Sequence, residues 1–131
     1  MKILQPPAWA RTRGFAKGSA VKGGTTVYIA GQVGYNGQGP WEEKGFAGQF
    51  RQALANILAV LAEAGGRPEH LVRLTWYVLD KQEYLGALKD VGAAYRELIG
   101  RHYPVMAVVQ VSGLVEAEAR LEIEATAVIP D

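Results

Sequence analysis

Two glutamates near the end of the sequence have the clearest potential for chemistry. Glu122 and Glu124 lie two positions apart in a segment, residues 119–129, that alternates between apolar and polar side chains. This alternation predicts a β-strand with both carboxylates on one face, about 7 Å apart. A solvated polar face, paired with Arg120 or with basic residues near the N-terminus, explains them without catalysis. Covered by another subunit, however, one glutamate would be desolvated and able to handle a proton at neutral pH.

Other residues that support catalysis are too few, or wrongly spaced, for the common active-site patterns. The chain has no cysteine, and its only histidines and serines are His70, His102, Ser19 and Ser112. The serines lack the context of a nucleophile, and the histidines lack the spacing of a metal site. The glycine-rich loop 31–39 lacks the Lys-Ser or Lys-Thr pair of a phosphate-binding loop. The sequence therefore predicts neither a metal nor another cofactor.

Composition and charge describe an ordinary globular domain. The 131 residues, 49% hydrophobic and 21% charged, predict a single domain over residues 1–131. No cysteine, membrane-spanning run or signal peptide is visible, which predicts a cytoplasmic protein without a membrane partner. The net charge is +1. Basic residues gather within residues 1–24, but the overall excess is too small to favour nucleic acid as a partner.

Hydrophobic periodicity predicts the elements that position these residues. Extended stretches are expected at 14–21, 25–30, 71–79, 105–112 and 119–129, and helices at 46–64 and 84–99. A hairpin turn is expected at Gly23 and Gly24, between the first two strands. The order ββ-α-β-α-ββ predicts an α+β fold with two helices on one face of a sheet. The apolar strand 105–112 should be buried on both sides, and the uncovered sheet face favours an oligomer.

Four segments together resemble the signatures of one known family. They are VYIAGQ at residues 27–32, QFRQALANI at 49–57, YPVM at 103–106 and LEIEA at 121–125. In this order and spacing they are similar to the reactive intermediate deaminase family, also called RidA, YjgF or L-PSP. The resemblance extends over about residues 14–128.

The resemblance implies a fold like that of the Bacillus type of chorismate mutase, assembled as a homotrimer with clefts between subunits. It also implies hydrolysis of reactive enamines and imines, such as 2-aminoacrylate or 2-iminobutanoate, to 2-oxo acids and ammonia. No cofactor is implied. Some family members have been described as translation inhibitors with ribonuclease activity.

The family's site residues transfer only in part. Glu122 matches the acid that positions the attacking water, and Gly31 and Gln32 are retained, with Ala107 as a further backbone contact. The arginine that binds the substrate carboxylate is replaced by Met106, which cannot form its paired hydrogen bonds. Two hydroxyl-bearing positions are also changed, to Ala30 and Phe15. The pattern resembles an arginine-less subgroup of the family.

Three functions remain open at this point. The first is an imine or enamine deaminase that uses Glu122, with another cation replacing the lost arginine; Arg73, Arg101 and the segment 13–17 are the candidates. If no cation reaches the cleft, the ligand should be neutral and apolar, held by Met106, Phe15 and Trp76. The second is a trimer that binds a small metabolite without turnover. The third is a ribonuclease, which would need an acid–base pair of histidines that the sequence does not offer.

Overall fold

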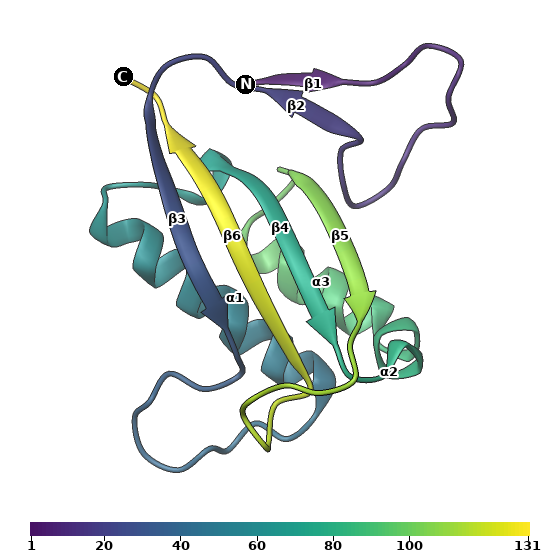
Figure 1. Ribbon diagram of the computed structural model, residues 1–131, viewed down its shortest axis with the longest axis vertical. Helices are drawn as coiled ribbons and strands as arrows, with labels where there is room; N and C mark the ends of the chain where they lie inside the picture. Colours follow the sequence, from purple (N-terminus) through teal and green to yellow (C-terminus); the bar gives the residue numbers. More distant parts are fainter.

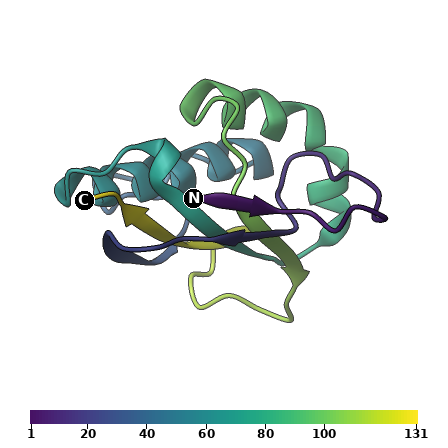
Figure 2. The same cartoon turned by 90° about the horizontal axis from the view of Figure 1, so that it is seen from above.

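The structure, a computed structural model that describes residues 1–131, has two main layers. Four strands form a mixed sheet in the order β3-β6-β4-β5, and the helices cover one face of it (Figures 1 and 2). The strands are β3 (Thr25–Gln32), β6 (Leu121–Ile129), β4 (Leu71–Val78) and β5 (Val105–Gln110). The predicted α+β class is confirmed. None of the helices has the length and apolar character needed to cross a membrane.

The hydrophobic core lies between the sheet and α1 (Phe46–Glu63). Phe50, Leu54 and Ile57 form the apolar stripe of this helix and are fully buried against the sheet. Residues 121, 123, 125 and 127 of β6 face the same core, whereas Glu122 and Glu124 face away from it. The two-faced strand predicted from alternation is therefore confirmed, and both glutamates lie on the face that the helices leave uncovered.

The helix predicted over residues 84–99 is two helices. α2 (Lys81–Gly86) begins earlier, because the carboxylate of Asp80 accepts a hydrogen bond from the Gln82 backbone N–H at 2.8 Å. Ala87, with ψ near 8°, then interrupts the backbone before α3 (Leu88–Leu98). The weak helix propensity of Gly86 explains why a continuous apolar stripe does not produce a continuous helix.

The hairpin predicted between residues 14–21 and 25–30 is wrong. β2 (Gly18–Ala20) pairs instead with β1 (Lys2–Leu4), as a separate two-stranded ribbon at one end of the molecule (Figure 1). Gly23 and Gly24 do turn the chain, both with positive φ. No buried face fixes the pairing of such a short, glycine-containing strand, so its partner could not be deduced from the residue pattern.

The strand predicted to be buried on both sides is an edge strand. β5 pairs with β4 alone, in parallel, and its other edge meets the chain at a single bridge between Ala16 and Val105. Its side chains are half-buried or exposed. A strand this apolar at an open edge is a surface suited to contact with another chain.

Candidate functional site

The Glu122 carboxylate lies against the backbone of Gly31. A β-carbon added at Gly31 would stand 2.4 Å from Oε2 of Glu122, so no residue with a side chain fits there without moving the carboxylate. Glu122 is half-buried and forms no ion pair or side-chain hydrogen bond within the chain. A carboxylate held near backbone without a partner is free to bind water or a ligand.

A β-bulge places Gly31 beside this carboxylate. Ile29 pairs with Ala125 and Gln32 with Ile123, so two residues of β3 stand opposite one residue of β6. The Gln32 amide donates a hydrogen bond to the carbonyl of Ala30 at 3.1 Å, across the bulge. We call Ala30, Gly31, Gln32 and Glu122 the Glu122 surface.

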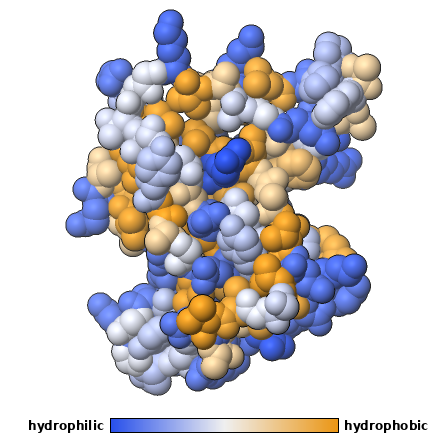
Figure 3. Space-filling view, in the orientation of Figure 1, coloured by the Kyte–Doolittle hydropathy of each residue, from blue (hydrophilic) through white to orange (hydrophobic).

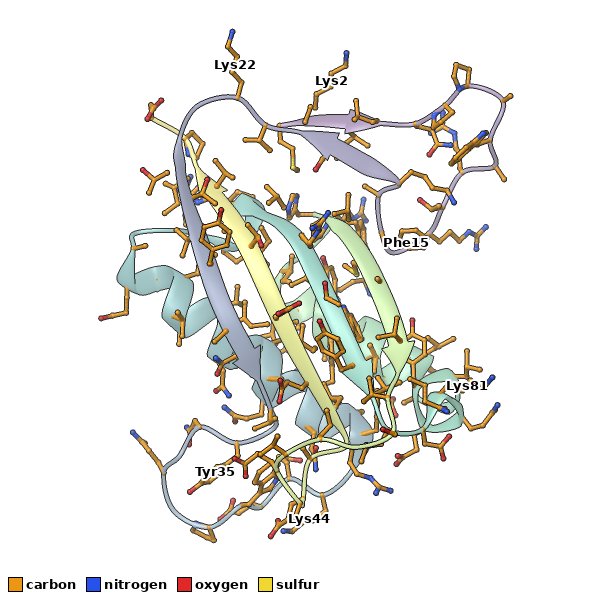
Figure 4. All side chains as sticks on the ribbon, viewed as in Figure 1. Lys2, Phe15, Lys22, Tyr35, Lys44 and Lys81 are labelled. Atoms are coloured by element: carbon orange, nitrogen blue, oxygen red, sulfur yellow. The ribbon has the colours of Figure 1, made fainter.

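Met106 lies elsewhere, in a cavity between β5, the α2–α3 pair and the segment before β2. We call this hollow, of about 580 Å³, the Met106 cavity. Most of the residues that line it are aromatic or aliphatic, with two arginines and two glycines among them: Arg13, Gly14, Phe15, Trp76, Tyr84, Leu88, Val91, Gly92, Tyr95, Arg96, Tyr103, Met106 and Val108. Phe15 reaches it from the loop beside the start of β5 (Figure 4).

Two pairs of aromatic rings strengthen the cavity wall. Trp76 and Tyr84 meet edge to face with centroids 5.8 Å apart, and Tyr95 stacks on Tyr103 at 5.3 Å. The Tyr95 hydroxyl donates to the His102 carbonyl at 2.6 Å, and burial raises the pKa of this phenol well above its usual value. The indole N–H of Trp76 is buried without a hydrogen-bond partner. The wall is therefore preformed and largely apolar.

The Glu122 surface and the Met106 cavity lie on opposite faces of the sheet. Met106 is in register with Leu74, which faces the helices, whereas Glu122 is opposite Tyr77 on the open face. One strand lies between β5 and β6, which alone separates them by about 10 Å. One chain therefore cannot bring both to the same small molecule.

Ala107 does not join Met106. Side chains alternate along a strand, and Ala107 is in register with Thr75 on the open face, outside the cavity lining. Of the cations considered from sequence, only Arg13 lines the cavity. Arg73 borders hollows on the open face instead.

Arg96 was missed from sequence, although a signal existed. It follows Leu88 and Gly92 at intervals of four residues, which puts all three on one face of α3. All three line the cavity.

Two buried amides were also missed as positioning residues. Gln49 is fully buried, donates to the carbonyls of Glu43 and Glu118, and accepts from the Arg120 backbone N–H at 2.7 Å. Asn56, two turns further along α1, donates to the carbonyls of Val33 and Tyr35. These bonds connect α1 to the loop that follows β3 and to the loop that precedes β6. Both loops lie next to the Glu122 surface. Both are polar residues within the apolar stripe of a helix, and this sequence feature could have identified Gln49 and Asn56.

Glu124 and the histidines have structural partners. Glu124 accepts a 2.7 Å hydrogen bond from Tyr77, which raises the pKa of the Tyr77 phenol. Nδ1 of His70 accepts from the Arg67 backbone N–H, and Nε2 of His102 lies 2.6 Å from the Leu71 carbonyl. The two histidines therefore hold backbone and do not form an acid–base pair. No group of three or more acidic or histidine side chains is arranged to hold a metal ion.

Figure 3 views the open face of the sheet, where hydrophobic patches alternate with hydrophilic ones. Arg73, Thr75 and Glu124 border a hollow on this face, together with Tyr28, whose side chain is 81% exposed. Such a face has the mixed character of protein–protein interfaces.

Comparisons with known proteins agree with the resemblance seen in the sequence. The family model described as endoribonuclease L-PSP matches residues 10–129. A RutC family protein of Pyrococcus horikoshii is 32% identical over 82% of each chain. The human 2-iminobutanoate/2-iminopropanoate deaminase is 31% identical over 79% of this chain and 72% of its own.

The matches to solved structures cover a larger share of the chain. The crystal structure of YyfB, a member of the conserved Rid family from Yersinia pestis, superposes with a TM-score of 0.86 at 29% identity, covering 98% of both chains. RidA of an Antarctic Psychrobacter superposes with a TM-score of 0.68 at 30% identity, covering 98% of this chain and 99% of its own. The sequence match over nearly the whole chain and the shared α+β architecture lead to one assignment: this protein belongs to the RidA/YjgF/L-PSP family.

Proposed function

We propose that this protein hydrolyses the C=N bond of reactive imines, and of enamines through their imine form, at sites shared between copies of the chain. The observation that carries the proposal is the unpartnered Glu122 carboxylate, which lies against the backbone of Gly31. The names of the mammalian relatives, 2-iminobutanoate/2-iminopropanoate deaminases, support the same reaction class.

The site forms where the Met106 cavity of one copy meets the Glu122 surface of another, in a homotrimer. Three features of the single chain support this arrangement. The two surfaces lie on opposite sides of the sheet, the apolar strand β5 has an open edge, and the open face carries hollows between β3, β6 and β4. A closed ring of copies, related by rotation, would bring each cavity to the same neighbouring surface.

Glu122 acts on water in this site. The water oxygen bonds to the imine carbon while the π electrons move to nitrogen, which takes up a proton. The Glu122 carboxylate accepts a proton from the attacking water and returns it to the amine. The C–N bond then breaks and ammonia leaves, while the hydroxyl releases its remaining proton and becomes the carbonyl oxygen; this proton balances the one that nitrogen took up first. The net reaction is imine plus water to 2-oxo acid plus ammonia.

The test measures the loss of 2-imino acids produced by an amino acid oxidase, with catalase present to remove peroxide. Wild-type protein should accelerate hydrolysis over a buffer control. Glu122→Gln should lower the rate at least about 100-fold, because an amide cannot accept the proton. Glu124→Gln is the matched control and should retain the rate, since Glu124 is bonded to Tyr77. If Glu122→Gln kept the wild-type rate, the mechanism would be wrong.

A second candidate, binding of a small metabolite without turnover, is favoured by two replacements. Met106 cannot form the paired hydrogen bonds that an arginine makes to a carboxylate, and Ala30 has no hydroxyl. This reading predicts that 2-oxo acids bind to the wild-type protein while no imine is hydrolysed faster than in buffer.

A further inference from the structure

The Met106 cavity is large and apolar compared with the small imines named for the relatives. Its volume of about 580 Å³ lies within the range of roughly 300–1,000 Å³ that holds drug-sized ligands. The ethyl group of 2-iminobutanoate would occupy a small part of it. Rings of Phe15, Trp76 and Tyr103 line the space, and aromatic walls pack well against an aromatic ligand.

Two arginines border the same cavity, and no acidic residue does. Arg13 comes from the loop before β2, and Arg96 from the last turn of α3. Neither forms an ion pair within the chain, unlike Arg51, Arg67 and Arg120. An arginine beside an apolar cavity offers a planar pair of donors for a carboxylate.

Gly92 makes room for Arg96 at the cavity. A β-carbon at this position would lie 3.3 Å from Nη1 of Arg96, although the backbone conformation of Gly92 does not require glycine. The guanidinium therefore lies across the helix surface at a residue that itself lines the cavity.

We propose that the substrate is a 2-imino acid with an aromatic or comparably bulky apolar side chain. The side chain occupies the Met106 cavity, and Arg13 and Arg96 hold the carboxylate in place of the family's arginine at position 106. This inference rests on the proposed function, because it names the substrate class of the same site shared between copies. Compared with an arginine at position 106, Met106 leaves the inside of the cavity more apolar. The positive charges then lie at the border of the cavity, on Arg13 and Arg96.

The experiment compares imines generated from phenylalanine and from alanine by one amino acid oxidase. The wild-type kcat/KM should be at least about tenfold higher for the phenylalanine-derived imine. Arg13→Gln and Arg96→Gln should each lower this value about tenfold, mainly through KM. Arg101→Gln, an exposed arginine outside the cavity lining, is the matched control and should leave it unchanged.

A binding measurement separates this inference from the proposed function. Phenylpyruvate and pyruvate, the corresponding products, are titrated calorimetrically into wild-type, Arg96→Gln and Arg101→Gln proteins. Tighter binding of phenylpyruvate, weakened only by Arg96→Gln, supports the cavity assignment even if no imine is hydrolysed. Equal or tighter binding of pyruvate overturns it, as does hydrolysis that favours the alanine-derived imine. If neither imine is hydrolysed, only the deaminase function is refuted, because the cavity assignment is judged by the binding of the two products.

Discussion

Under the proposed function, the residue at position 106 decides how a substrate carboxylate can be held. Met106 is a half-buried part of an apolar wall, with no donor to offer. Glu122 and Gly31, in contrast, are retained and lie in contact range of each other. The chain thus has the glutamate that we propose acts on water, and a methionine where the family resemblance implies the arginine that binds the substrate carboxylate.

Met106→Arg should shift the preference toward small imines. A guanidinium inside the cavity would bind the carboxylate of 2-iminobutanoate, and a charged hydrogen-bonded pair contributes about 1.5–3 kcal/mol. We expect kcat/KM for 2-iminobutanoate to rise about tenfold or more. The same change should lower kcat/KM for the phenylalanine-derived imine, because it fills and charges the apolar cavity.

Met106→Leu is the control for the shape of the wall and should change neither value appreciably. If Met106→Arg folds and assembles but gains nothing on small imines, position 106 does not face the substrate carboxylate. Steady-state kinetics on both imines decide between these outcomes.

Candidate site residues could be named from the sequence only where a motif contained them. Glu122, Gly31 and Met106 lie in short segments with a recognisable pattern. Arg96 belongs to no such segment, because a helix surface tolerates an arginine at many positions. Its role depends on what packs beside α3, which is a tertiary property.

At the scale of elements, two buried amides of α1 hold the loops that frame Glu122. Gln49 satisfies three backbone groups from two loops, those of Glu43, Glu118 and Arg120. A buried backbone group left without its partner costs about 1–3 kcal/mol. These bonds therefore contribute both to stability and to the position of the start of β6.

Gln49→Leu should lower the free energy of unfolding by about 3 kcal/mol, because it leaves those backbone groups unpaired while preserving side-chain volume. Urea titration followed by circular dichroism measures the change. Gln82→Leu, at an exposed helix position, should alter stability by less than about 0.5 kcal/mol. A loss at Gln49 no larger than at Gln82 would mean that the loops are not held by this amide.

Elements with a strong periodic pattern were predictable, and those without one were not. α1 and β6 bury one clear face each, so period and burial agree. β2 has three small residues and no buried face, which is why its pairing with β1 could not be predicted. The break at Ala87 follows from local backbone preferences that a continuous apolar stripe conceals.

At the scale of the whole molecule, the two parts of the proposed site lie on opposite faces of the sheet in one chain. The Met106 cavity lies on the helix side of the sheet, and Glu122 on the open side. Sequence predicted an oligomer from the uncovered face, but it could not show that these two parts are separated by the sheet itself. That separation is the physical basis of the proposal that the site lies between copies.

Subunit mixing tests this claim most directly. Glu122→Gln keeps the cavity, and Val108→Trp, which fills the cavity, keeps Glu122. Each variant alone should be inactive in imine hydrolysis, after both are shown to be folded oligomers. Equal amounts unfolded and refolded together should recover about a quarter of the wild-type rate, because random assembly in a ring pairs an intact cavity with an intact Glu122 at that frequency. Mixed oligomers that remain as inactive as their parents would contradict a site shared between copies.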